Sequence, residues 1–136
     1  MGRLLLVCIG GALGSGARYL VASWAASALP VGYPAGTTIV NVVGSWFLAA
    51  VMDLSLRFDV IGPDVRIFLA TGVAGGFTTY STFNWETMRL LEERAYGLAA
   101  TYVVGTLLAC GLAGLLGVAT SRLAVAAFSG LFSRGG

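Results

Sequence analysis

The residues of this chain that could bind an ion are gathered in one segment, Thr71–Glu86, which reads TGVAGGFTTYSTFNWE. The segment combines glycines, which disfavour a regular helix, with hydroxyl side chains, aromatic rings and one carboxylate. Backbone carbonyls freed by an interrupted helix can hold a cation, whereas helix N-termini, hydroxyl groups and ring edges can hold an anion. The segment therefore predicts ion binding.

Most catalytic chemistry lacks its usual side chains here. The sequence contains no histidine, and its two cysteines, Cys8 and Cys110, lie within apolar runs with no neighbouring metal ligand. Acid–base, nucleophilic and transition-metal catalysis rely on such residues. We therefore expect both thiols to be buried and inert, and the protein not to be an enzyme.

The composition is typical of a membrane protein. Of the 136 residues, 57% are hydrophobic and only 10% are charged, and the mean hydropathy is +0.87. A soluble domain needs far more charge to cover its surface. The net charge of +2 is too small to indicate a nucleic-acid partner.

Apolar stretches of about 20 residues, enough to cross a bilayer, occur four times along the chain, at 4–29, 37–56, 65–91 and 96–121. We therefore predict an all-α integral membrane protein of four transmembrane helices, with a channel domain over 1–122. The segment 123–136 is small and ends in glycine, so we expect a frayed C-terminal tail.

The third stretch is expected to break near the bilayer midplane. Gly72, Gly75 and Gly76 are followed at once by Thr78 and Thr79, and all are poor or indifferent helix formers. A break frees backbone groups that lipid cannot satisfy, so it is tolerated only where protein, water or an ion meets them. The alternative is a glycine-rich packing notch in a continuous helix.

Side chains after the break favour an ion site over a notch. Tyr80, Phe83 and Glu86 follow one another at intervals of three, so they share one helical face. Ser81 and Thr82 add hydroxyl groups beside them. An aromatic pair alone is more often core, but this one stands among polar groups and next to the expected break.

Polar residues in two other stretches lie at comparable depth. Thr37 and Asn41 are four apart in the second, and Tyr102 and Thr106 are four apart in the fourth. An intramembrane Asn is costly unless it is bonded, so Asn41 is either functional or an interhelical hydrogen-bonding group. Arg18 is the one charge within the first stretch.

A conducting pathway is expected to need two chains. Small residues at intervals of four, such as Gly10 with Gly14 and Gly105 with Ala109, mark helix contacts within one chain or between two. Four closely packed helices enclose no aqueous lumen, which favours a second copy. The bias of arginine between the two sides is weak, so the chain could insert in both senses.

Three segments carry a resemblance to a known family. The runs GGALGSGARY, GTTIVNVVGS and GGFTTYSTFNWET resemble the signatures of the small dual-topology fluoride channels of the Fluc (CrcB) type, and the likeness covers about 10–116. It implies a fluoride-selective channel of the prokaryotic cell membrane, through which cytoplasmic fluoride leaves passively and toxicity is relieved. It also implies an antiparallel homodimer with two pathways.

The resemblance further implies roles for individual residues. Carbonyl oxygens of Gly75 and Thr78 would hold a structural sodium ion that is not transported. Residues along the fluoride pathway would be Asn41, Tyr80, Ser81, Thr82, Phe83, Glu86, Tyr102 and Thr106, with Arg18 near a vestibule. The first aromatic of the family is usually Phe, so Tyr80 is a departure that adds a donor and bulk.

Two other classes of function are weighed against the channel. A small four-helix proton-coupled multidrug exporter has a similar length, but it needs a carboxylate in the first helix, where this chain has only Arg18. A scaffold protein would not require a midplane break with polar groups around it. The residues themselves support an anion pathway, and only the resemblance specifies fluoride.

Overall fold

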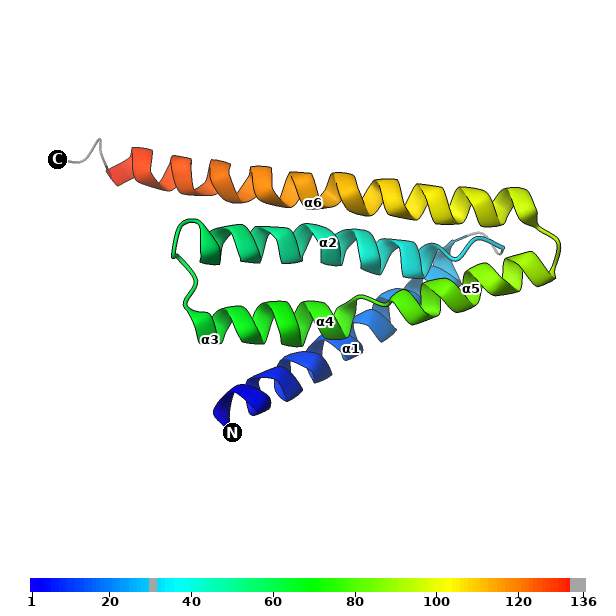
Figure 1. The fold of residues 1–136 in the computed structure, drawn as a ribbon, viewed down its shortest axis with the longest axis horizontal. Helices are drawn as coiled ribbons and strands as arrows, with labels where there is room; N and C mark the ends of the chain where they lie inside the picture. The colour runs from blue at the N-terminus through cyan, green and yellow to red at the C-terminus, as the bar shows by residue number, and fades with distance from the viewer. Residues whose placement is uncertain (30–31, 133–136) are drawn as a thin grey trace.

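The computed structural model describes residues 1–29 and 32–132, and over these residues it is an all-helical bundle without strands (Figure 1). Its elements, in chain order, are α1 (Gly2–Ala28), α2 (Ala35–Leu56), α3 (Pro63–Arg66), the π-helix η1 (Ile67–Ala74), α4 (Gly75–Phe77), α5 (Tyr80–Glu92) and α6 (Tyr96–Phe132). The prediction of an all-α fold is confirmed.

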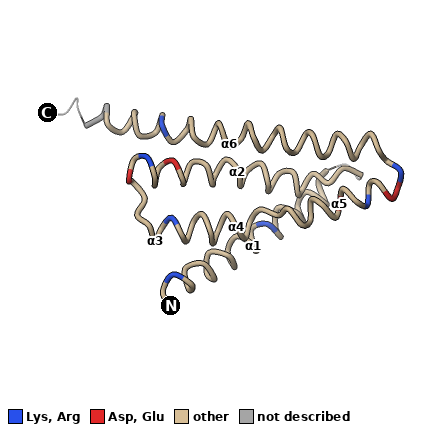
Figure 2. Tube along the Cα trace, viewed as in Figure 1, with Lys and Arg blue, Asp and Glu red and all other residues tan. Residues whose placement is uncertain are grey.

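Three helices in the described part of the chain are long and apolar enough to cross a membrane: α1, α2 and the stretch Tyr96–Ser129 of α6. Large apolar side chains such as Leu13 and Leu112 are exposed on their outer faces, as expected where lipid replaces water. Most charged residues gather at the two ends of the bundle (Figure 2), and they mark the two membrane boundaries.

The segment from Pro63 to Glu92 runs the length of the bundle beside α2, but as successive helical pieces (Figure 1). The pieces are α3, η1, α4 and α5, and no single one is as long as a span. Between α4 and α5 the backbone is extended, with φ −80° and ψ 158° at Thr78 and φ −152° and ψ 115° at Thr79. The extended pair divides the glycine-rich half of the segment from the aromatic half.

Glycines allow α1 to approach this segment closely. A Cβ at Gly10 would lie 2.6 Å from the carbonyl oxygen of Phe68, and one at Gly14 would overlap the carbonyl oxygen of Val73. Such contacts are the usual origin of small-residue seams in lipid, where close van der Waals packing holds helices together. The Gly10 and Gly14 pair therefore forms a seam within one chain, between α1 and η1.

Small residues recur at intervals of four along α6, at Gly105, Ala109, Ala113 and Gly117, and this stripe has two different parts. Ala113 and Gly117 are buried, and a Cβ at Gly117 would overlap the carbonyl oxygen of Trp46 on α2. By contrast, nothing lies within 4 Å of a Cβ built at Gly105. Only the second half of the stripe is therefore used to pack α6 against α2.

Helix α6 is longer than the sequence indicates. We expected its span to end near Ser121, but the helix continues without interruption to Phe132. The side chain of Asp53 accepts a 2.5 Å hydrogen bond from Ser121 and lies 3.7 Å from Arg122, so α2 and α6 are joined where α2 ends. The separate tail 123–136 stays a prediction, and residues 133–136 lie outside the described part.

Candidate functional site

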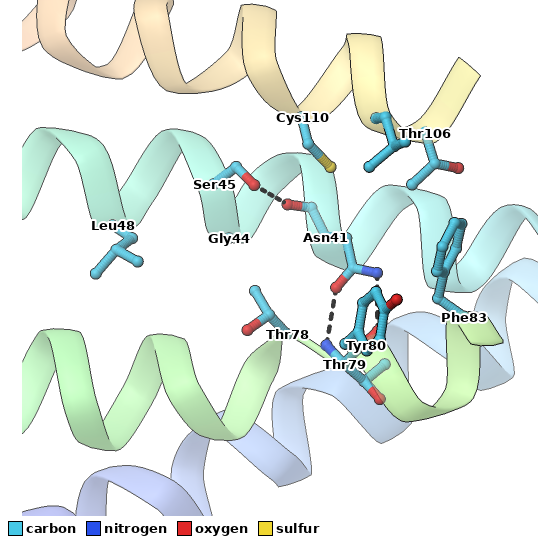
Figure 3. Close-up of a pocket in the computed structure, with 11 residues that line it drawn as sticks. Asn41, Gly44, Ser45, Leu48, Thr78, Thr79, Tyr80, Phe83, Thr106 and Cys110 are labelled. Carbon is cyan, nitrogen blue, oxygen red and sulfur yellow. Dashed lines mark hydrogen bonds between the residues drawn. The ribbon is translucent and has the colours of Figure 1, made fainter. Parts of the chain in front are cut away.

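Asn41 holds the extended pair between α4 and α5. Its amide nitrogen donates to the carbonyl oxygen of Thr79 at 3.0 Å, and its Oδ1 accepts from the Thr79 N–H at 2.8 Å (Figure 3). A break in a helix leaves such backbone groups without intrahelical partners, and lipid supplies none. Asn41 therefore has the interhelical role that the sequence left open, and one of its two amide hydrogens remains for another acceptor.

Two threonines shape the break itself. Thr78 ends α4, where both its N–H and its Oγ1 donate to the Ala74 carbonyl at 3.0 Å. Thr79 is the N-cap of α5, and its Oγ1 accepts from the Thr82 N–H at 3.2 Å. The exposed Ser81 lies beside it, with its hydroxyl 3.4 Å from that of Thr79. The threonine pair thus stops one helix and starts the next.

A cavity of about 260 Å³ opens at this break, and we call it the break cavity (Figure 3). The aromatic pair differs sharply in environment: Tyr80 is 77% exposed and Phe83 only 8%, with 5.9 Å between their ring centroids. The residues that line the cavity are Asn41, Gly44, Ser45, Leu48, Thr78, Thr79, Tyr80, Phe83, Thr106, Leu107 and Cys110. Its wall therefore combines amide, hydroxyl and aromatic groups.

Cys110 is a lining residue that sequence reasoning missed. We expected it to be buried in apolar surroundings, but it lies in the wall of the break cavity with Asn41 and Thr106. The signal was present, because Tyr102, Thr106 and Cys110 are four apart and so share one face of α6. Cys8, in contrast to the expectation of a buried thiol, is exposed on α1.

Glu86 is held between two hydroxyl groups. Its Oε1 accepts from Thr37 at 3.0 Å and its Oε2 from Tyr102 at 2.7 Å. Tyr102 is fully buried, with its ring centroid 5.0 Å from that of Phe83. Hydrogen bonds to a carboxylate are among the stronger ones in proteins, so α2, α5 and α6 are tied together around this group.

Arg18 belongs to a different opening of about 300 Å³, whose wall also includes Ser15, Thr37, Thr79 and Thr82. No acidic oxygen lies within 4.0 Å of its guanidinium among the described residues. An unpaired arginine makes an opening attractive to anions. The structure thus places Arg18 and Thr82 on one side of Thr79, and Tyr80, Phe83 and Thr106 on the other.

The expected cation site offers only backbone oxygens. No cluster of three or more His, Cys, Asp or Glu side chains suited to a metal ion occurs in the described part of the chain. Gly75 is exposed, with only the Ala70 carbonyl oxygen, at 3.9 Å, near a Cβ built there. Because the Thr79 N–H donates to Asn41, the Gly75 carbonyl lacks the partner it would have in an α-helix. Such an oxygen is a hard ligand of the kind that suits a small cation.

One family model and several named relatives match this chain over most of its length. The family model described as CrcB-like protein, Camphor Resistance (CrcB), matches residues 5–118. A protein of Anaeromyxobacter dehalogenans named fluoride-specific ion channel FluC is 56% identical over 110 residues, which cover 81% of this chain and 87% of that protein. A protein with the same name from Sorangium cellulosum is 40% identical, over 93% of this chain and 99% of its own length.

Proposed function

The chain belongs to the CrcB-like protein family, and on this premise we propose that it is a fluoride-specific ion channel. It is a multi-pass membrane protein, and cytoplasmic fluoride leaves through it down the electrochemical gradient. The observation that carries the proposal is the 56% identity to a fluoride-specific ion channel over 81% of this chain. The channel is not an enzyme, because it moves the ion without chemical change.

The lining of the break cavity supports an anion as the permeant ion. Fluoride is small and tightly hydrated, so a pathway must replace its water with hydrogen-bond donors. The cavity offers the second amide hydrogen of Asn41 and the edges of the Tyr80 and Phe83 rings. No acidic side chain lines it. We assign the pathway to Asn41, Tyr80, Ser81, Thr82, Phe83, Glu86, Tyr102 and Thr106, with Arg18 at its vestibule.

The active form is proposed to be an antiparallel homodimer. Each chain would cross the bilayer four times, with Pro63–Glu92 as the third, broken span, and the two copies would insert in opposite senses. Support comes from the exposed position of Tyr80 and Gly75 on either side of the break. A second copy would cover these residues and enclose two pathways between the chains.

A structural sodium ion fits the backbone oxygens at the break. Carbonyls of Gly75 and Thr78, contributed by both copies, would hold it, and its charge would lower the cost of bringing an anion to low dielectric. What the residues themselves do is separate from the ion: Asn41 bonds both backbone groups of Thr79, and the Gly75 carbonyl is thereby left without its helical partner.

The experiment that tests this function is anion release from liposomes. The purified full-length protein is reconstituted in vesicles loaded with fluoride or chloride, and release is followed with ion-selective electrodes. We expect rapid release of fluoride and none of chloride above the background of empty vesicles. Equal release of the two anions, or no release of either, would refute the proposal.

A further inference from the structure

Tyr33 is presented by a constrained turn that leads into α2. Gly32 before it has φ +115°, in the left-handed region that favours glycine, and Pro34 after it has φ fixed at −75° by its ring. The Ala35 N–H donates to the Tyr33 carbonyl oxygen at 2.8 Å. The backbone is thus constrained on both sides of Tyr33, and it sets the direction in which the Tyr33 side chain leaves the turn.

The ring of Tyr33 packs on that of Tyr102. The two rings meet edge-on, with 5.6 Å between their centroids and 89° between their planes, which is a preferred arrangement of aromatic pairs. Tyr102 is fully buried, and its ring centroid lies 5.0 Å from that of Phe83. The Tyr102 ring is therefore held by two aromatic neighbours, Phe83 from α5 and Tyr33 from the turn before α2.

The ring held in this way carries the hydroxyl group that meets Glu86. The Tyr102 hydroxyl donates to Glu86 Oε2 at 2.7 Å, and Glu86 Oε1 accepts from Thr37 at 3.0 Å. Hydrogen bonds of this kind weaken as their distance and direction depart from the optimum. Because the hydroxyl is rigidly attached to the ring, a tilt of the Tyr102 ring would displace the donor from the carboxylate. A side chain that fixes this ring also fixes the geometry at Glu86.

Tyr33 also lies between the buried pair and the end of the bundle where α2 begins. Two openings of about 290 and 420 Å³ occur there, and both are lined by Tyr33 and Glu86. The smaller one includes Ala22 of α1, and the larger one includes Arg89 of α5. Tyr33 is 37% exposed, whereas Tyr102 is fully buried. Tyr33 therefore forms a shared wall of both openings and covers Tyr102.

We propose that Tyr33 is a positioning residue of the anion pathway, whose ring holds Tyr102 so that the Tyr102 hydroxyl stays directed at Glu86 during conduction. The inference rests on the proposed fluoride conduction and deepens it, because it adds a residue that acts through Tyr102. The ring of Tyr33 matters here and its hydroxyl does not, since that hydroxyl lies 3.4 Å from the Thr38 oxygen, beyond the usual range for two hydroxyl groups.

The test compares fluoride release by the full-length protein in liposomes after Tyr33→Leu and Tyr33→Phe. Leucine is apolar but has no ring, so we expect release to slow by about threefold to tenfold, the value of one aromatic pair. Phenylalanine keeps the ring and should release fluoride within about twofold of wild type. Tyr96→Leu makes the same change at an exposed position of α6 and should leave release unchanged. A Leu variant as fast as wild type or faster, or a Phe variant as slow as the Leu variant, overturns the proposal.

A double substitution separates positioning from a general effect on the fold. Tyr102→Phe removes the hydroxyl and should slow release by at least about tenfold. Adding Tyr33→Leu should then slow release by no more than about twofold further, because no hydroxyl remains to be positioned. A purely structural Tyr33 would slow release equally in both backgrounds, and that additivity overturns the proposal, as does a Tyr102→Phe variant as fast as wild type.

The result is kept independent of how one variant folds. Tyr33→Met, a second apolar replacement without a ring, is measured in parallel and should slow release as much as Tyr33→Leu. Size-exclusion chromatography before reconstitution shows which variants keep the assembly of wild type, and release is compared among these. If wild type itself releases no fluoride, the proposed function fails. If wild type conducts and both ringless variants conduct equally well, only the role of Tyr33 fails.

Discussion

Replacing Asn41 with Asp tests the link between the helix break and conduction with a change of one functional group. The amide nitrogen that donates to the Thr79 carbonyl becomes an oxygen, while the oxygen that accepts from the Thr79 N–H is kept. The variant therefore loses one hydrogen bond and sets a carboxylate oxygen against a carbonyl oxygen. It also places a negative charge in the wall of the break cavity.

Two magnitudes follow from this geometry. The unpaired, partly buried carbonyl should cost roughly 1–3 kcal/mol of stability. For an anion about 4 Å from the new carboxylate, at an effective dielectric constant of about 20, the repulsion is about 4 kcal/mol. A barrier raised by that amount slows permeation by about a thousandfold, since each 1.36 kcal/mol is about a factor of ten.

The assay is fluoride release from liposomes, with Asn84→Asp as the matched control. Asn84 is exposed on α5 and lines none of the cavities described above, so the same substitution there should leave release unchanged. Size-exclusion chromatography shows whether each variant keeps its assembly. A correctly assembled Asn41→Asp protein that releases fluoride within about threefold of wild type would remove Asn41 from the pathway.

Three more predictions concern packing, capping and thiol access. Gly14→Ala should lower the thermal midpoint in detergent markedly, because a Cβ there overlaps the backbone of η1, whereas Gly16→Ala, with nothing within 4 Å, should not. Thr79→Val removes the N-cap of α5 and should cost about 1 kcal/mol, most of which Thr79→Ser restores in thermal unfolding. A small methylating thiol reagent should slow fluoride release by the protein that contains Cys110, because this thiol lines the break cavity. The same reagent should have no effect on a variant that keeps only Cys8, which is exposed on α1. An equal effect on the two proteins would contradict the assignment of the break cavity to the pathway.

The helical membrane fold class, and several residues of the candidate site, could be predicted from sequence because they depend on local composition. Apolar length and scarce charge indicate membrane helices whatever their packing, and the run from Gly72 to Thr79 disfavours a continuous helix through its own propensities. Spacing also placed Tyr80, Phe83 and Glu86 on one face of α5. These properties depend on residues that are neighbours in the sequence, so they can be predicted without knowing how the helices pack together.

Pairings between helices were not predictable in the same way. Nothing local indicates that Asn41 bonds the backbone of Thr79, that Thr37 turns to Glu86 while Thr38 turns to Thr106, or that Cys110 reaches the break cavity. Each depends on how far α2 and α6 are rotated about their axes and shifted along the bundle. The rotation and the shift are set by close contacts between helices, such as the contact at Gly117. The periodicity of a single helix carries no information about these contacts.

By itself, then, the sequence determined that this is a helical membrane protein and predicted an interruption in its third apolar stretch, since these features follow from composition and helix propensity. Only the tertiary structure decided which partner each polar side chain bonds. The polar side chains of α2 stand next to one another in sequence, but a hydrogen bond forms with whatever partner the neighbouring helix presents. For that reason Thr37 donates to a carboxylate on α5, while the neighbouring Thr38 lies within hydrogen-bond distance of the Thr106 hydroxyl on α6 and of the Pro34 carbonyl.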